Sequence, residues 1–311
     1  MVAWFQKLPF QTRWMAWIWC GILVLVCWEQ SHWWQVREDY LFGYLSLPFA
    51  LYVLYERLPK IQDVLLVQNC TIPSPPAWLK YFSVLALISA FGAISLGSLI
   101  LYAQGHSQPA SFLMSLGFPM IVFSSVILFA QNMTGGQLPL GERLRLIGLL
   151  AFPSLVWILS TPVLSFIENR ISLILLRQVM TVVFFIFDSL GLFIEQRGNT
   201  LLLPKGPVGV ADACSGIRSL MACLFAGSFL GAVFLSSLLK KCIFVLIACA
   251  LAFVFNIARS LFLTVWAYRN GPDSIAGVVH DFTGFAVLGL TAVCLLALVP
   301  LFETKSQTLT S

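Results

Sequence analysis

Residues 214–260 read CSGIRSLMACLFAGSFLGAVFLSSLLKKCIFVLIACALAFVFNIARS. Two long apolar runs lie on either side of Lys240 and Lys241. Each run is close to the length that an α-helix needs to cross roughly 30 Å of hydrocarbon at about 1.5 Å per residue. A pair of lysines between two such runs is typical of a turn at a membrane surface. The stretch therefore predicts two antiparallel membrane-spanning helices, near 216–238 and 242–268.

The rest of the chain has the composition of a multi-pass membrane protein. Of its 311 residues, 59% are hydrophobic and only 10% are charged, and the mean hydropathy is +0.91. These values lie outside the range of soluble domains. We therefore predict an all-α fold, a polytopic helix bundle that forms a single membrane domain over residues 1–311. About eight spans are expected, near 14–28, 39–55, 79–103, 110–131, 146–165, 216–238, 242–268 and 281–302.

One further segment, 171–195, is long enough to span but carries Arg177, Asp188 and Glu195. If it crosses the membrane, residue 214 falls on the same side as the N-terminus. If it does not cross, the basic residues of the short loops share one side, as the positive-inside bias favours. We therefore expect an interfacial or re-entrant helix near 171–195 and a cytoplasmic position for these basic residues. They are Lys7, Arg13, Arg57, Lys60, Lys80, Arg143, Arg145, Lys240, Lys241 and Lys305.

The sequence lacks the features of disulfide-rich, zinc-binding and nucleic-acid-binding proteins. Most of the 8 cysteines lie inside apolar runs without C-x-x-C spacing, so neither a disulfide framework nor a zinc site is expected. No basic tail suggests a nucleic-acid partner. We expect no metal and no cofactor.

Helix rise brings three polar residues to one membrane surface. Three stretches of 18 or 22 residues each cover about 27–33 Å, close to one membrane thickness. They are Arg218–Lys240, Lys241–Arg259 and Asp281–Glu303. With the lysines at the cytoplasmic surface, Cys214, Arg259 and His280 all reach the outer surface.

A thiol, a cation and an imidazole are the groups that an acyl-transfer site needs. A lone cysteine is most often a packing residue, but Cys214 precedes a helix start. There, free N–H groups of Ser215 and Gly216 and the helix dipole favour a thiolate and can hold an oxyanion. Asp212 and Arg218 lie close by in the sequence and are candidate supporting residues.

A purely structural role is harder to accept for Arg259 than for His280. An arginine inside an apolar span is costly and normally faces a polar cavity or partner, and Asn256 shares its helix face. His280 opens HDFTGF at a helix start, where it can act as an acid or base. The main alternative to a catalytic role is that His280 is simply a hydrogen-bonded polar residue at the membrane interface. The same alternative applies to His32 and His106.

Three blocks, ADACSGIRSL, NIARS and HDFTG, resemble in their order the motifs of the exosortase/archaeosortase family of membrane cysteine transpeptidase-proteases. The preceding RGNTLLLPKGPVGVADACSG resembles the glycine-containing hairpin of that family. The resemblance is good over roughly 150–300, so 146–302 is interpreted as an exosortase-like catalytic core and 14–145 as N-terminal spans that are loosely family-like. It implies that Cys214 is the nucleophile, that Arg259 stabilises charge at the scissile carbonyl and that His280 transfers protons.

Two positions depart from the family pattern. Asp212 stands where members commonly have Glu, which keeps an acid beside the cysteine. EDYLFGYL resembles an early Tyr-Ser-His-Gly block, but Leu41 and Phe42 replace its Ser and His. A polar contribution from this block to the site is therefore in doubt.

The resemblance also implies partners and a location. Substrates would be secreted proteins whose C-terminal tail comprises a short motif, one transmembrane helix and a basic cluster. The enzyme would lie in the bacterial inner (plasma) membrane, surrounded by lipid, with its active site facing the periplasm or exterior. Small residues that permit close helix approach, either by a substrate helix or within the protein itself, are Gly92, Gly97, Gly227 and Gly231.

Three other functions compete with this interpretation. In a transporter or channel, Asp188, Arg259 and His280 would line a path, but such proteins carry polar groups near the membrane midplane, whereas these gather near one surface. A non-catalytic scaffold gives no reason for a thiol beside a helix start. A glycosyl or lipid transferase would need a carboxylate cluster, which the sequence does not offer.

The predicted topology can be tested by cysteine labelling from outside the cell. Single cysteines placed near Pro204 and Gly271 should react with a membrane-impermeant reagent, whereas one near Lys240 should react only after the membrane is opened. External labelling near Lys240 would reverse the orientation and require that 171–195 cross the membrane.

Overall fold

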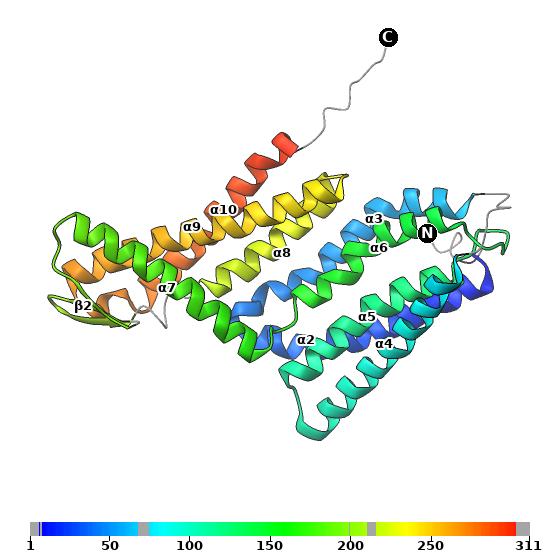
Figure 1. The fold of residues 1–311 in the computed structure, drawn as a ribbon, viewed down its shortest axis with the longest axis horizontal. Coiled ribbons are helices and arrows are strands. Elements are labelled where there is room, and N and C mark those ends of the chain that lie inside the picture. Colours follow the sequence, from blue (N-terminus) through cyan, green and yellow to red (C-terminus); the bar gives the residue numbers. More distant parts are fainter. Residues whose placement is uncertain (1–5, 7, 68–74, 199, 210–215, 303–311) are drawn as a thin grey trace, which may run out of the picture. The chain divides into compact units, whose positions relative to one another are not determined.

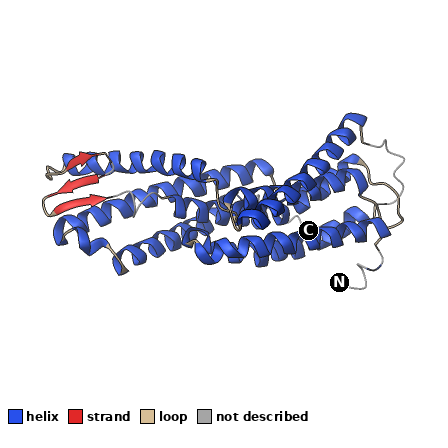
Figure 2. Cartoon of the chain, turned by 90° about the horizontal axis from the view of Figure 1, so that it is seen from below, coloured by secondary structure: helices blue, strands red, loops and turns tan. Residues whose placement is uncertain are grey.

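The computed structural model describes residues 6, 8–67, 75–198, 200–209 and 216–302, most of which are helical (Figures 1 and 2). Contacts divide the chain into two compact units, Met1–Leu164 (unit 1) and Ser165–Ser311 (unit 2). The sequence-based boundary between N-terminal spans and core, after residue 145, falls inside a helix that packs within unit 1. Each unit is described on its own.

Unit 1 consists of five long helices and one 3₁₀ helix. Helices α2, α4 and α5 are mostly apolar, whereas α3 and α6 are shorter and carry a group of charged residues near one end. The pairs that pack most closely are α4 with α5, α3 with α6, and α5 with α6. The elements are α2 (Phe10–Val36), η1 (Glu38–Leu45), α3 (Ser46–Leu65), α4 (Ala77–Gln104), α5 (Gln108–Phe129) and α6 (Leu140–Leu159).

Glycine allows α4 and α5 to approach each other closely. A Cβ at Gly97 would lie 2.7 Å from the Met114 side chain, and a Cβ at Gly117 would lie 2.6 Å from Ile94. Small residues at such crossings let helices gain packing contacts inside lipid, where no hydrophobic effect drives association. Gly97 therefore packs within the protein, which is the structural alternative considered for it.

A buried amide joins three helices of unit 1. Gln30 of α2 donates from Nε2 to the Ser115 hydroxyl of α5 at 2.6 Å and to the Trp157 carbonyl of α6 at 2.8 Å. Its Oε1 accepts from the hydroxyl of Ser160 at 2.7 Å. Both N–H groups and the carbonyl oxygen of this side chain are thus used, as the burial of an amide requires.

The block EDYLFGYL forms the 3₁₀ helix η1 against the end of α2. A Cβ at Gly43 would overlap the indole of Trp34, at 2.1 Å from its Nε1, so only glycine fits there. The Trp34 Nε1–H donates to the carbonyl of Ser160 at 3.1 Å, and the buried Tyr40 hydroxyl accepts from the Val163 N–H at 2.9 Å. This block therefore has a packing role, and its Leu41 side chain is exposed.

Unit 2 contains four long helices, a small sheet and one 3₁₀ turn (Figure 1). Helices α8 and α9 form a close hairpin, and α10 returns along α9. The elements are α7 (Ser165–Ser189), β1 (Glu195–Arg197), β2 (Thr200–Leu203), β3 (Gly206–Gly209), α8 (Ile217–Phe234), α9 (Leu238–Asn270), η2 (Pro272–Ile275) and α10 (Val278–Phe302).

Contacts along α9 show how its two antiparallel neighbours are aligned. Gly227 of α8 would place a Cβ 2.7 Å from that of Ala248, so this glycine too packs within the protein. Near the start of α9, the ammonium group of Lys240 donates to the Phe302 carbonyl at the end of α10 at 2.9 Å. The starts of α8 and α10 therefore lie at the same end of this three-helix group, as predicted from the spacing of charges.

Helix α9 is longer than a bilayer requires, at 33 residues or about 50 Å. Beyond the part that pairs with α8, it packs against α7 and the sheet, an antiparallel meander in the order β1-β2-β3 (Figure 2). Their shared core contains Val183 and Phe187 of α7, Leu201 of β2, and Leu263 and Ala267 of α9. Strands β2 and β3 thus confirm the hairpin expected from the glycine-containing motif, and β1 adds a third strand.

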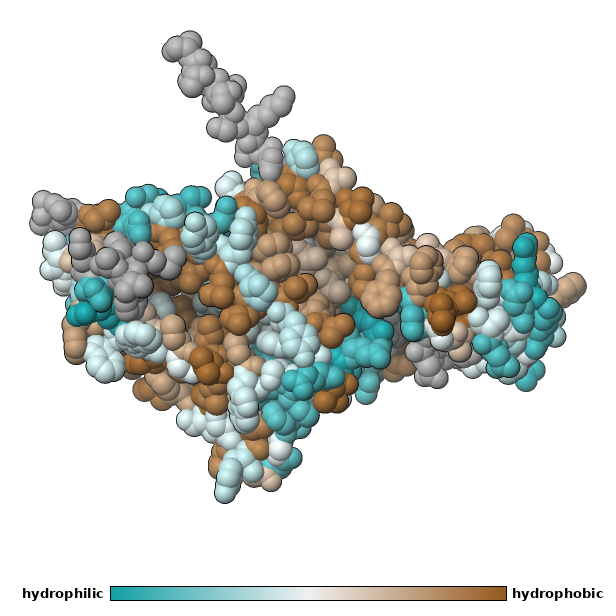
Figure 3. Space-filling model, turned by 180° about the vertical axis from the view of Figure 1, so that it is seen from behind, coloured by the Kyte–Doolittle hydropathy of each residue, from teal (hydrophilic) through white to brown (hydrophobic). Residues whose placement is uncertain are grey.

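Among the residues that the structure describes, seven helices are long and apolar enough to cross a membrane, namely α2, α4, α5, α7, α8, α9 and α10. The expected spans near 39–55 and 146–165 differ from this set. Residues 38–45 form the 3₁₀ helix, and α3 and α6 each carry at least three charged residues. Figure 3 shows apolar side chains (brown) over much of the viewed surface; in α4, Leu85, Ile88 and Leu99 are each more than half exposed.

Segment 171–195 is not a single helix. Helix α7 begins earlier, at Ser165, and ends at Ser189, and Glu195 begins strand β1. The side chains of Arg177, Asp188 and Glu195 are exposed, away from the buried face of α7. Length and hydropathy alone make α7 a possible span, so its interfacial position stays a prediction.

The Gln30 bridge should stabilise unit 1 measurably. We expect Gln30→Ala to lower the free energy of unfolding by about 1–2 kcal/mol, because it leaves buried groups on α5 and α6 without their partner. The measurement is denaturant unfolding in detergent micelles. Gln131→Ala is the matched control, since that amide donates only to the exposed Gln11 side chain. Equal midpoints for the two variants would contradict the role assigned to Gln30.

Candidate functional site

Arg259 lies on α9 and reaches the first turn of α10. Its Nη2 lies 2.9 Å from Nε2 of His280 and donates to the His280 carbonyl at 3.2 Å. Its Nε donates to the Thr283 hydroxyl at 3.4 Å. The guanidinium is half-buried, and these acceptors satisfy much of the donor capacity of a cation that cannot lose its charge.

His280 lies between a cation and a carboxylate. Its Nε2 faces Arg259, and its Nδ1 lies 3.3 Å from Oδ1 of Asp281. The His280 side chain is 25% exposed and that of Asp281 is 68% exposed, so the site opens toward solvent on the carboxylate side. The carbonyl of His280 also accepts from the Thr283 hydroxyl at 2.9 Å, which ties the turn together.

The start of α8 meets α9 next to this pair. Gly216 precedes the helix with φ +74°, a left-handed conformation that favours glycine. A Cβ there would lie 2.7 Å from Nδ2 of Asn256, which is buried. Asn256 is one turn before Arg259 on the same face of α9. The structure thus brings together Gly216, Asn256, Arg259 and His280, four of the residues singled out in the sequence.

A small pocket lies between the start of α8 and the face of α9 that carries Asn256. It is lined by Leu175 of α7, Gly216 and Leu220 of α8, and Phe253 and Asn256 of α9. Its walls are apolar except for the asparagine amide. The contribution of α7 to this lining was not visible in the sequence, because Leu175 lies in an apolar run without a distinguishing pattern.

The remaining sequence candidates are placed as follows. Cys214, Ser215 and Asp212 lie outside the described residues. Arg218 is in the first turn of α8, where its side chain is exposed. The six cysteines that are described form no disulfide, and of these Cys223 is buried in α8.

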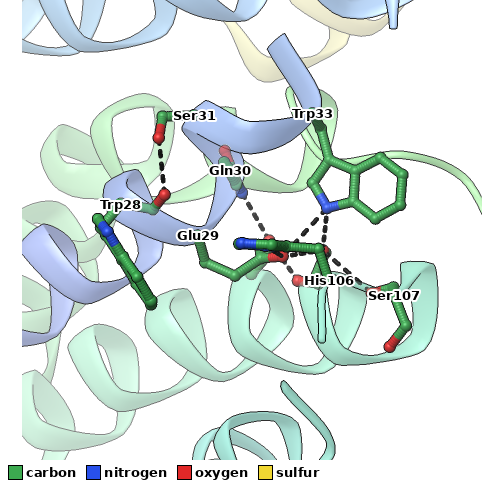
Figure 4. A network of polar contacts seen from close by, with 9 residues as sticks. Trp28, Glu29, Gln30, Ser31, Trp33, His106 and Ser107 are labelled. Atoms are coloured by element: carbon green, nitrogen blue, oxygen red, sulfur yellow. Dashed lines mark hydrogen bonds and ion pairs between the residues drawn. The ribbon is translucent and has the colours of Figure 1, made fainter. Parts of the chain in front are cut away.

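A second polar cluster, which the sequence analysis missed, lies in unit 1 around Glu29 (Figure 4). This fully buried carboxylate accepts from the Ser111 hydroxyl and, at 3.0 Å, from the Trp33 indole N–H. His106 Nδ1 lies 3.6 Å from it, and the His106 ring stacks on that of His32 at 3.9 Å between centroids. Both histidines thus belong to this cluster, which joins α2 to the start of α5.

No metal site is formed by the part of the chain that the structure describes, since no group of three or more His, Cys, Asp or Glu side chains could hold an ion there. The chemistry of the described site comes from a fixed guanidinium, an imidazole and the N–H groups of the first turn of α8. A guanidinium and backbone N–H groups stabilise negative charge, and an imidazole moves protons. This combination suits acyl transfer at a carbonyl.

Residues 33–297 match the family model of the transmembrane exosortases, which covers most of the chain and the whole described site. A comparison with curated proteins gave no match, and neither did a comparison with solved structures.

The contact at Gly216 predicts a specific sensitivity to mutation. Gly216→Ala should lower the free energy of unfolding by at least about 1 kcal/mol, because the left-handed conformation is costly for alanine and its Cβ meets Asn256. Gly289→Ala in α10 is the control, since nothing lies within 4 Å of a Cβ there. Thermal unfolding of the purified variants in micelles measures the difference; equal stability of the two would refute the contact.

Proposed function

Since this chain belongs to the transmembrane exosortase family, we propose that it is an integral-membrane cysteine protease or transpeptidase. It cleaves the C-terminal sorting tail of secreted proteins through a thioester on Cys214. The observation that carries the proposal is the contact of Arg259 with His280, next to the point where Gly216 meets Asn256.

Chain connectivity supports a place for Cys214 in this site. Cys214 precedes Gly216 by two residues in the sequence, and the Cα atoms of successive residues lie about 3.8 Å apart in an ordinary chain. Gly216 is in contact with Asn256, one helical turn from Arg259. A thiol so close to the N-terminus of α8 has free N–H groups and the positive end of a helix dipole nearby, which favour the thiolate.

The proposed reaction has two halves. His280 takes the proton of the Cys214 thiol as the sulfur attacks the scissile carbonyl, and the oxyanion is stabilised by Arg259 and by N–H groups at the start of α8. The intermediate collapses as the C–N bond breaks, and His280 gives a proton to the departing amine. Water or an amine then attacks the thioester and gives a proton to His280, and the Cys214 thiolate leaves. Water gives hydrolysis, and an amine gives transpeptidation.

The substrate and its location belong to the same proposal. A sorting tail with one transmembrane helix would lie in the bilayer beside this enzyme and present its motif at the outer surface of the bacterial inner membrane. The two lysines at the start of α9 precede Arg259 by 18 and 19 residues, about one membrane thickness, as a cytoplasmic turn opposite an outer site requires. A transport path needs polar groups near the membrane midplane. The polar groups of this site lie instead at the level where α8 and α10 begin.

Substitution of the three residues tests the mechanism. Conversion of a tailed precursor to its shortened product should be lost with Cys214→Ala and nearly lost with Cys214→Ser, since a hydroxyl is much harder to deprotonate than a thiol. Arg259→Lys should be slowed by about 100-fold or more, because a point charge cannot replace the guanidinium fork. His280→Asn should be impaired to a similar extent.

Two other cysteines provide controls for this experiment. Cys223→Ala and Cys249→Ala should process the precursor at nearly the normal rate, because the first is buried in α8 and the second lies inside α9. Each variant is checked for expression in the membrane fraction. A well-expressed Cys214→Ala variant that still shortens its substrate would exclude the thioester mechanism and favour a transporter or scaffold.

A further inference from the structure

We infer that Asp281 is a positioning residue that fixes the tautomer of His280, with the proton on Nδ1 and the lone pair on Nε2 directed at Arg259. The tautomer follows from the described contacts alone. Its consequence for catalysis rests on the proposed function.

Two contacts of the ring favour the same tautomer of a neutral imidazole. A guanidinium has only donors, so the Nε2 atom, 2.9 Å from Arg259 Nη2, must accept. A carboxylate has only acceptors, so the Nδ1 atom, 3.3 Å from Asp281, must donate. Both contacts therefore place the single ring proton on Nδ1. The opposite tautomer would direct an N–H at a guanidinium N–H and a lone pair at a carboxylate oxygen.

Thr283 fixes the other member of the pair. Its hydroxyl accepts from Arg259 Nε at 3.4 Å and donates to the His280 carbonyl at 2.9 Å. The same carbonyl accepts from Arg259 Nη2 at 3.2 Å. Guanidinium and imidazole are thereby held by one turn of α10, so the Nε2 lone pair stays directed at Arg259.

This arrangement gives Asp281 a role in the proposed reaction. While Arg259 donates to Nε2, the imidazole cannot take up a proton there. When the guanidinium turns to a forming oxyanion, the lone pair is released next to the reacting groups and can accept a proton. The Asp281 carboxylate then faces the resulting imidazolium on its Nδ1 side. The contact with Asp281 thus continues to favour the tautomer that makes Nε2 the basic atom after the guanidinium has turned away.

The tautomer can be measured without substrate. The chain has 3 histidines, so protein labelled with ¹⁵N-histidine gives few signals, and His280→Asn identifies those of His280. Magic-angle spinning NMR in lipid bilayers, at a pH above the usual range for histidine titration, should show Nδ1 protonated in the native protein. Asp281→Ala should raise the share of the Nε2–H tautomer, because it removes one of the two contacts that favour the native one. Asp281→Asn should keep the native share, because its amide oxygen can still accept from Nδ1.

Asp273→Ala is the matched control, since this acid lies on η2 and is not within bonding distance of His280 in the described contacts. It should leave the tautomer unchanged. An Nε2–H tautomer in the native protein would overturn the inference, and so would a native tautomer that persists in Asp281→Ala.

Kinetics provide a second readout that separates this inference from the proposed function. Asp281→Ala should lower kcat by about 10-fold with little change in KM, and Asp281→Asn should recover most of that loss. The loss is modest because the Asp281 side chain is 68% exposed and its charge is screened by water. Equal kcat values for Asp281→Ala and the native protein would contradict the role in catalysis. An active Cys214→Ala variant would instead refute the proposed mechanism and leave the tautomer as measured.

Discussion

An arginine inside the apolar run of α9 determines the arrangement of the helices around it. The guanidinium of Arg259 keeps its charge and offers donors only, so its position in a membrane-spanning helix requires acceptors nearby. The first turn of α10 supplies them through the His280 ring, the His280 carbonyl and the Thr283 hydroxyl. Helix α10 therefore has to begin at the level of Arg259.

The same face of α9 fixes the start of α8. Asn256 lies one turn before Arg259, and the chain passes so close to its amide that only a residue without a side chain fits. Gly216 meets that need and also takes the left-handed conformation that turns the chain into α8. A cation and a close backbone crossing on one helix face thus bring together the ends of two other helices.

Much of this could be predicted from the sequence because it depends on rise along single helices. Lys240, Arg259 and His280 are charges or polar groups in otherwise apolar runs, so their spacing gives their levels in the membrane. The Glu29 cluster could not be predicted in the same way. One carboxylate hardly changes the hydropathy of α2, and its partners, Ser111 and His106, come from other parts of the chain. Likewise, nothing in the spacing of Asp281 reveals which nitrogen of His280 carries the proton.

The length of α9 explains why one helix contacts both the sheet and the start of α8. Past Arg259, the helix continues to Asn270 and packs through Leu263 and Ala267 against α7 and the sheet. At the end of the sheet, a Cβ at Gly206 would lie 3.1 Å from Pro272, directly after α9. The chain is therefore attached to one helix on both sides of residues 210–215, through β3 before them and Gly216 after them. If α9 were only as long as the bilayer is thick, it would contact Gly216 but not the sheet. The added turns of α9 therefore connect the sheet to the helix that carries Arg259.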